Sequence, residues 1–140
     1  RLLDMGIEEY LVASTVSIAI GQRLVRKICS DCKEKIVITH AMKEALAKTP
    51  HAALLVNNEF VYKGKGCDKC NGCGYRGRVC INEVLVADAE IKEAILSRAS
   101  AAEIKKIAIK NGMTTMFEDG FNKVKNGYTT VEEVLRVIHE

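Results

Sequence analysis

The first 28 residues carry apolar side chains at roughly the spacing of one face of an α-helix. A short turn containing Gly6 comes first, and the apolar positions after it return at intervals close to one or two helical turns. The pattern therefore predicts a long helix that runs up to Cys29. The apolar positions are Ile7, Leu11, Ile18, Leu24, Val25 and Ile28.

The middle of the chain shows shorter and more mixed patterns. Residues 41–48 have a helical pattern that Pro50 would end. Residues 54–62, with the sequence LLVNNEFVY, suit a pair of strands that turns at the two asparagines. Residues 79–86 are rich in β-branched side chains and predict a further strand.

The last third of the chain carries repeated signals for helix ends. Gly112 and Gly127 each follow an asparagine, where a left-handed C-cap is expected. Residues 88–140 should therefore form a subdomain of short helices, and the expected fold class is α+β, mainly α-helical. Three Ser/Thr-x-x-Glu sequences, typical of helix starts, are Ser100 with Glu103, Thr115 with Glu118, and Thr130 with Glu133.

Length and charge narrow the possible functions. With 140 residues the chain can form one ordinary domain, or a small globular part with a metal-stapled insert. The formal net charge of +3 is small and the basic residues are scattered, so we expect no nucleic-acid partner. No apolar run reaches the roughly 18 residues of a membrane span.

Two further segments could suggest phosphate binding. The five glycines between positions 64 and 77 match neither of the common phosphate-loop patterns, so we assign no catalytic and no nucleotide-binding residue. The basic run at residues 22–27 should be the solvated face of a helix, although its arginines could meet a phosphate or a carboxylate of a neighbouring subunit.

The six cysteines carry the strongest chemical signal. Four of them form two CxxC pairs, Cys29 with Cys32 and Cys67 with Cys70, which usually serve as metal ligands or redox groups in a reducing compartment. Two residues between ligands let both sulfurs point inward from one turn, and two such turns complete a tetrahedral zinc site. The 34 residues between the pairs, 33–66, would hang from this site as a lobe. A cytosolic protein with structural zinc is expected.

Other interpretations of the cysteines stay open. A redox CxxC needs a strand before a helix, whereas Cys29 should follow a helix. An iron–sulfur cluster could use Cys67, Cys70, Cys73 and Cys80, which lie within fourteen residues. The sequence CDKCNGCG also matches one CxxCxGxG element of the zinc module of J-domain co-chaperones, which uses several such elements. If the two pairs bind zinc, Cys73 lies near the metal and Cys80 is a small residue on the strand.

Four motifs, in this order, resemble the C-terminal region of the motor ATPases of type II secretion and type IV pilus assembly. They are RLLDMG, QRLVRKIC followed by the rest of its CxxC, CDKCNGCGYRGRVCINEVL, and GMTTMFEDGFNKVKNGYTTVEEVLRV. The resemblance covers residues 1–33 and 64–140. Where the family usually has a hydroxyl, a small and an aromatic residue, this chain has Cys73, Cys80 and Asn82, so a site of five or six thiols stays open.

The resemblance implies a tetracysteine zinc site on Cys29, Cys32, Cys67 and Cys70, in agreement with the spacing. It also implies that a RecA-like core, with the phosphate loop and a magnesium-holding acidic motif, precedes Arg1. ATP and Mg²⁺ would then bind only the full-length parent. The start at Arg1 without a methionine fits a piece of a longer polypeptide.

The resemblance also divides the chain and implies its function. Residues 1–28 would finish the core as a helix, residues 29–87 would be a zinc-binding lobe with a variable insert at 34–63, and residues 88–140 would be the C-terminal helical subdomain. The parent would be a cytoplasmic hexamer, peripheral to the bacterial inner membrane, that powers secretion or pilus assembly. Its partners would be its own subunits and an inner-membrane platform protein or cytoplasmic docking domain. The fragment would be non-catalytic.

Two other functions remain as alternatives. The chain could be a free-standing zinc adaptor, or chaperone-like module, that binds a protein partner or RNA. It could also be an iron–sulfur electron carrier, which visible absorbance would reveal. A start codon directly before Arg1 would favour the adaptor.

Overall fold

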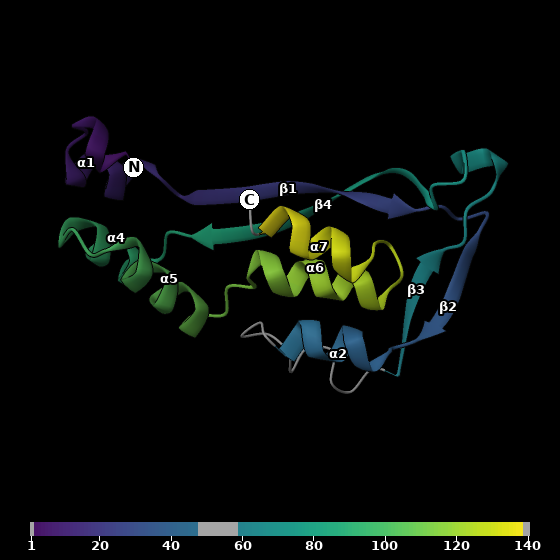
Figure 1. The fold of residues 1–140 in the computed structure, drawn as a ribbon. Coiled ribbons are helices and arrows are strands. Elements are labelled where there is room, and N and C mark those ends of the chain that lie inside the picture. Colours follow the sequence, from purple (N-terminus) through teal and green to yellow (C-terminus); the bar gives the residue numbers. More distant parts are fainter. Residues whose placement is uncertain (1, 48–58, 139–140) are drawn as a thin grey trace. The chain divides into compact units, whose positions relative to one another are not determined.

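The computed structural model describes residues 2–47 and 59–138, and its fold is α+β, as predicted. None of the helices in these ranges has both the length and the apolar character that a membrane crossing needs. The strands are β1 (Ile18–Ile28), β2 (Lys33–Val37), β3 (Phe60–Gly64) and β4 (Tyr75–Val86) (Figure 1). The helices are η1 (Leu3–Met5), α1 (Glu9–Thr15), α2 (His40–Ala47), η2 (Asp68–Cys70), α4 (Ala89–Leu96), α5 (Ala101–Lys110), α6 (Met116–Lys125) and α7 (Val131–Ile138).

Strand β1 corrects the helix that we expected up to Ile28. Helix α1 ends at Thr15, the chain is extended at Val16 (φ −79°, ψ 118°), and eleven residues of strand follow. Ile18 and Ile20 are two residues apart, which suits a strand, while the wider spacing of the apolar positions also fits a helix. Pairing with β4 decides between the two, because a partner strand satisfies the backbone groups of β1.

Within the described residues, the strands form two sheets of two strands each, β1 with β4 and β2 with β3. β2 and β3 are antiparallel, with Lys33 opposite Gly64 and Val37 opposite Phe60. The strand predicted at residues 79–86 is confirmed and begins earlier, at Tyr75.

The helix and the strand pair predicted for the middle segment can be compared with the structure only in part. Helix α2 confirms the helical pattern from residue 41 to 47, whereas Lys48 and Pro50 lie outside the described residues. The expected turn at Asn57 and Asn58 lies outside them too. The second half of that segment forms β3, whose partner is β2.

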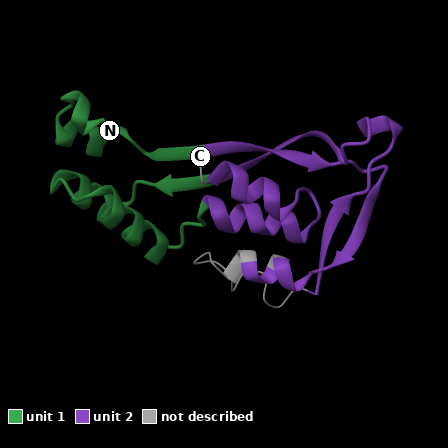
Figure 2. Ribbon diagram, viewed as in Figure 1, with its two compact units in different colours: residues 1–21, 83–115 green, residues 22–82, 116–140 purple. Residues whose placement is uncertain are grey.

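The described chain divides into two compact units (Figure 2). Unit 1 comprises residues 1–21 and 83–115, and unit 2 comprises residues 22–82 and 116–140. Residues 88–140, expected as one helical subdomain, contribute to both units. Their helices are local in sequence but pack onto different cores.

The core of unit 1 joins α1 to α4 and α5. Ile91 on α4 is fully buried, and the small side chains Ala13 and Ala108 let the helices approach closely. Arg98, which follows α4, also forms an ion pair with Glu9 on α1. The buried core residues are Val12, Ala13, Ala87, Ile91, Ile95 and Ala108.

Unit 2 packs α6 and α7 against its strands in two apolar clusters. One cluster contains Val61 of β3 and the stacked rings of Phe117 and Phe121, whose centroids are 4.7 Å apart. The other contains Val25 of β1, Ile81 of β4 and Val137 of α7. These contacts fix the strands that end at the cysteine pairs.

The helix ends follow the sequence signals in most places. Ser100 and Glu103 form the predicted reciprocal capping box at the start of α5, and α6 begins directly after Thr115. Gly112 and Gly127 have positive φ angles of 96° and 69°, which confirms both left-handed caps.

Candidate metal centre

The four cysteines of the two CxxC pairs come together in unit 2. Cys29 and Cys32 lie in the turn between β1 and β2. Between β3 and β4, Cys67 directly precedes η2 and Cys70 is the last residue of η2. Their four sulfur atoms all lie within 4.8 Å of one another. The Sγ–Sγ distances are 3.9 Å for Cys29 and Cys67, 3.8 Å for Cys32 and Cys70, and 3.8 Å for Cys67 and Cys70.

These distances match a tetrahedron of thiolates around one ion. With Zn–S bonds of about 2.3 Å, the edge of a regular tetrahedron is about 3.8 Å. A disulfide would need sulfurs about 2.05 Å apart, and all six cysteines are free thiols. The group could therefore hold a metal ion, and its geometry is compatible with zinc.

Glycines shape the loop that carries the second pair. Gly66 and Gly72 both have positive φ angles, and a Cβ on Gly66 would lie only 2.5 Å from the carbonyl oxygen of Gly72. Gly64 and Gly74 approach each other in the same way. Side chains at these positions would push the two arms of the loop apart and separate the sulfurs.

Backbone N–H groups point at two of the sulfurs. Cys67 N and Gly74 N donate to Cys70 Sγ at 3.2 and 3.3 Å, and Gly66 N donates to Cys32 Sγ at 3.3 Å. The backbone hydrogen bond from Cys67 is the main cause that lowers the pKa of Cys70 to about 6. Burial raises the pKa of Cys67 and raises that of Cys32 to about 12. The thiolate of Cys70 therefore forms most readily, and a bound cation would favour the deprotonated forms of Cys32 and Cys67.

A charged contact joins the two CxxC turns outside the sulfurs. Lys69 Nζ lies 3.2 Å from Asp31 Oδ1, and Arg76 Nη1 lies 3.9 Å from Asp31 Oδ2. The hydrogen bond from Lys69 is the main cause that lowers the pKa of Asp31. The residues between the cysteines thus hold the two turns together on the solvent side.

The other two cysteines lie outside this group. Cys73 is exposed, with its Sγ 3.2 Å from the carbonyl oxygen of Tyr75, and Cys80 is half-buried on β4. The thiols that converge are therefore those of the two CxxC pairs, not the sequence-local set that ends at Cys80. Cys29 follows strand β1 and not the helix that we expected before it. The strand β2, and not a helix, comes after Cys32, which still differs from the redox context.

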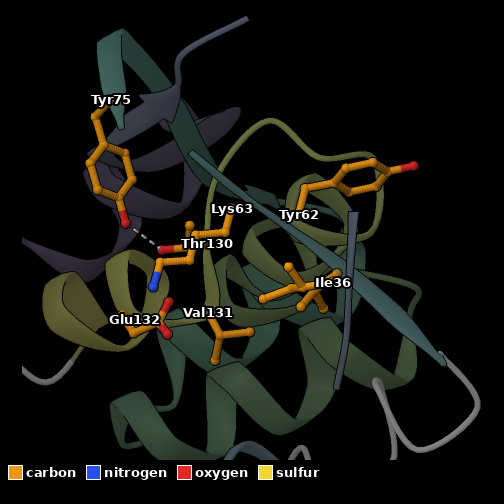
Figure 3. A pocket seen from close by; sticks show the side chains of 8 residues that line it. Ile36, Tyr62, Lys63, Tyr75, Thr130, Val131 and Glu132 are labelled. Carbon is orange, nitrogen blue, oxygen red and sulfur yellow. Dashed lines mark hydrogen bonds between the residues drawn. The ribbon is translucent and has the colours of Figure 1, made fainter. Parts of the chain in front are cut away.

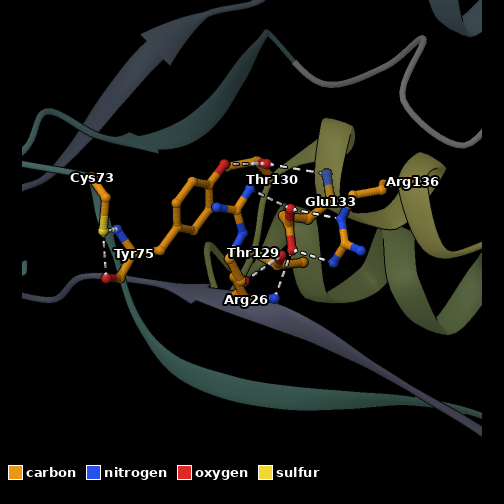
Figure 4. Close-up of polar contacts among 7 residues, drawn as sticks. All are labelled: Arg26, Cys73, Tyr75, Thr129, Thr130, Glu133 and Arg136. Carbon is orange, nitrogen blue, oxygen red and sulfur yellow. Dashed lines mark hydrogen bonds and ion pairs between the residues drawn. The ribbon is translucent and has the colours of Figure 1, made fainter.

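Sequence reasoning missed the role of Glu133, which the structure places at the centre of a polar network (Figure 4). Glu133 is only 1% exposed. Its carboxylate accepts from the backbone N and the Nη2 of Arg26 at 2.9 and 2.7 Å, and from the Nε and Nη2 of Arg136 at 3.2 and 3.1 Å. Burial raises the pKa of Glu133, but the hydrogen bonds from both arginines outweigh it and bring the pKa to about 2.

The network ties β1 and β4 to the start of α7. The guanidinium of Arg26 lies 4.3 Å from the ring centroid of Tyr75, whose hydroxyl is 2.9 Å from Thr130 Oγ1. Thr129 Oγ1 donates to the carbonyl of Arg26 at 2.8 Å. Arg26 belongs to the basic run that could have met a carboxylate of another subunit, but it meets one of its own chain. Thr130 accepts from Glu133 N, whereas the Glu133 carboxylate turns to the arginines instead of closing the predicted box.

A small pocket lies near this network, beside β2, β3 and the start of α7 (Figure 3). Its volume is about 250 Å³, below the roughly 300–1,000 Å³ of typical small-molecule sites. We therefore assign it no ligand. Its lining residues are Ile36, Val61, Tyr62, Lys63, Tyr75, Thr130, Val131 and Glu132.

Fold and site together define an α+β module with a four-thiol candidate metal site. A family model described as Type II/IV secretion system protein matches residues 1–136, so the chain belongs to this family. This confirms the resemblance seen in the sequence motifs.

The relatives of the chain include ATPases of type IV pilus assembly and proteins of type II secretion systems. The Type IV pilus assembly ATPase PilB of Thermus thermophilus is 42% identical over 135 residues, which are 96% of this chain and 15% of that protein. The Type II secretion system protein E of Aeromonas hydrophila and the Type II secretion system ATPase E of Vibrio cholerae are each 38% identical over 140 residues. Those residues are the whole of this chain and 27% of each relative. The chain thus spans between about a seventh and a quarter of these relatives' length.

Proposed function

We propose that the chain is the C-terminal, zinc-binding part of a hexameric cytoplasmic ATPase that powers type II protein secretion or type IV pilus assembly. The family match and the relatives named as ATPases support this proposal. ATP and Mg²⁺ bind the core of the longer protein, and this part is non-catalytic. The assembled motor lies at the cytoplasmic face of the bacterial inner membrane.

The observation that carries the proposal is the convergence of four thiols at tetrahedral distances. Cys29, Cys32, Cys67 and Cys70 are the proposed ligands, and the donor set suits Zn²⁺ because soft thiolates favour it. When bound, zinc supplies a structural cross-link and no catalytic step.

The cross-link acts on segments that have little core of their own. Around the site, Ile28, Cys29, Cys70 and Gly74 are buried, while most other residues of the two turns are half-buried or exposed. The ion pair between Asp31 and Lys69 holds the two turns together, and the metal fixes the positions of the four sulfur atoms. We infer that the lobe stays rigid while motor subunits shift, and that it contacts the platform protein or a cytoplasmic docking domain.

Replacing both Cys67 and Cys70 by Ser in the full-length protein tests this function in its host. The expected result is loss of zinc from the purified protein and a strong loss of secretion or piliation, at unchanged expression. The matched control is Cys73→Ser with Cys80→Ser, which removes two thiols outside the group and should keep both zinc and function. Normal secretion by the zinc-free variant would contradict the proposed role.

The genomic sequence upstream of Arg1 separates this proposal from the adaptor alternative. The proposal requires nucleotide-binding motifs in the same reading frame. An initiating codon directly before Arg1 would instead favour a free-standing zinc adaptor.

A further inference from the structure

Three arginine side chains surround an open pocket of unit 2 that the proposed function does not use. The pocket has a volume of about 560 Å³, within the roughly 300–1,000 Å³ of typical small-molecule sites. All of its lining residues belong to unit 2, so the pocket lies within one compact unit. We call it the arginine pocket, and it is lined by Leu24 and Arg26 of β1, Arg78 of β4 and Arg136 of α7.

The two strands supply the pocket from the faces that the apolar core leaves over. Val25 of β1 is buried in one apolar cluster of unit 2, and Val79 of β4 packs against the same cluster. Side chains alternate between the two faces of a strand. Leu24 and Arg26 flank Val25, and Arg78 directly precedes Val79, so these three side chains lie on the faces opposite to the core positions. All three are exposed to solvent.

Buried Glu133 fixes two of the three guanidinium groups (Figure 4). Its carboxylate accepts from Nη2 of Arg26 at 2.7 Å, and from Nε and Nη2 of Arg136 at 3.2 and 3.1 Å. The guanidinium of Arg26 also lies over the ring of Tyr75, 4.3 Å from its centroid. Both arginines are therefore oriented before a ligand arrives, which reduces the entropy lost on binding.

The carboxylate of Glu133 does not balance the charge of the arginine pocket. Three guanidinium groups meet this one carboxylate, which leaves an excess of two positive charges. Among the residues that the structure describes, the side chain of Arg78 has neither an ion pair nor a hydrogen bond. Like charges held close together destabilise a fold. A doubly charged anion in the pocket would relieve this repulsion.

We propose that the arginine pocket binds the phosphate group of a phosphate monoester. At neutral pH such a group carries a charge of about −1.5 to −2, which matches the excess charge of the pocket. Guanidinium groups bind phosphate oxygens through paired hydrogen bonds, which makes arginine the preferred residue for this contact. The half-exposed side chain of Leu24 offers an apolar contact to the organic part of the ester.

Calorimetric titration of the zinc-loaded full-length gene product with phenyl phosphate tests this inference. Saturation with ADP and Mg²⁺ beforehand keeps the probe out of nucleotide sites. We expect Arg78→Gln to weaken binding by about tenfold or more, because charged hydrogen bonds are lost. Arg78→Lys keeps the charge but loses the planar fork, so its affinity should fall between those of wild type and Arg78→Gln.

Arg23→Gln is the matched control for the titration. Arg23 is an exposed residue of β1 outside the pocket lining, so this change removes the same charge and should leave the affinity unchanged. Equal losses of affinity in Arg78→Gln and Arg23→Gln would show only a response to net charge and would overturn the inference.

Chemical modification with phenylglyoxal, which attacks accessible guanidinium groups, gives a second measurement on the unaltered protein. It decides the question even if Arg78→Gln does not fold. Phenyl phosphate should slow the modification of Arg78 severalfold and leave the rate for Arg23 unchanged, as read by mass spectrometry. An unchanged rate for Arg78 would overturn the inference.

A soluble ester and a lipid headgroup offer the same phosphate group, and vesicles distinguish these two sources. The vesicles consist of phosphatidylcholine with or without phosphatidic acid. Binding of phenyl phosphate without binding of either kind of vesicle assigns a soluble ester. Binding of the vesicles with phosphatidic acid that Arg78→Gln abolishes and Arg23→Gln keeps assigns a lipid headgroup. A wild-type protein that binds neither phenyl phosphate nor these vesicles overturns the inference.

Discussion

Glu133 shows how a single residue can combine burial with charge in this protein. It is nearly inaccessible to solvent and is held by Arg26 and Arg136. Both arginine side chains are about half exposed, so their guanidinium groups stay hydrated while they neutralise the carboxylate. A sequence pattern can predict that Thr130 caps a helix, but it cannot show that a glutamate three residues later is aimed at a strand 107 positions away.

Glu133→Gln should destabilise unit 2 by about 2–3 kcal/mol, because a buried acceptor of charged hydrogen bonds is lost. The pKa of Glu133 is depressed to about 2, so its contribution is present above about pH 4.5 and is lost as the pH falls towards 2. Urea unfolding at several pH values checks this: the gap between wild type and variant should narrow in acid. Glu132→Gln, an exposed neighbour on α7, is the control. A gap that stays constant with pH would contradict the assignment.

Gly66 and Gly77 form a matched pair of residues for the metal loop. Both have positive φ angles, 96° and 78°, but a Cβ on Gly66 would meet the Gly72 carbonyl and a Cβ on Gly77 meets nothing within 4 Å. Both alanine variants should lose about 1–2 kcal/mol of stability to backbone strain. Only Gly66→Ala should also weaken zinc binding, measured by competition with a chromophoric chelator. Equal affinities in the two variants would argue against the role of the close approach.

At the scale of elements, the sequence predicts the helix ends well, but it predicts poorly which segments pair as strands. The caps at Ser100, Gly112 and Gly127 depend on neighbours in sequence, and all three are confirmed. β1 was mistaken for a helix because its identity depends on β4, which lies about fifty residues later. The two CxxC pairs could be grouped from sequence because metal chemistry restricts their spacing, whereas no spacing rule links Arg26 to Glu133.

Helix α6 can pack closely on α7 because Gly120 has no side chain. A Cβ there would lie 2.7 Å from Val134 Cγ1. Alanine is favoured over glycine in a helix by about 1 kcal/mol, but overpacking a core costs about 1–3 kcal/mol. The free energy of unfolding of Gly120→Ala, measured with urea, should therefore lie between the wild-type value and about 2 kcal/mol below it. In the Val134→Ala background, Gly120→Ala should no longer overpack the contact between the two helices. The double variant should therefore be more stable than the sum of the two single changes in unfolding free energy predicts, and simple additivity would contradict this account.

At the scale of the whole molecule, the chain consists of two compact units, and the candidate metal site belongs to unit 2. Zinc should therefore stabilise the two units unequally. Removal of the metal with a strong chelator should increase hydrogen exchange in β2, β3 and the η2 loop, while α4 and α5 of unit 1 keep their protection. Exchange measured by mass spectrometry with and without chelator checks this. An equal loss of protection in both units would contradict it.

X-ray absorption at the zinc edge, on protein purified without added metal or chelator, tests the central claim most directly. The account predicts zinc with four sulfur neighbours at about 2.3 Å. Absence of zinc, or a shell that contains nitrogen or oxygen ligands in place of some sulfurs, would contradict a site built from Cys29, Cys32, Cys67 and Cys70.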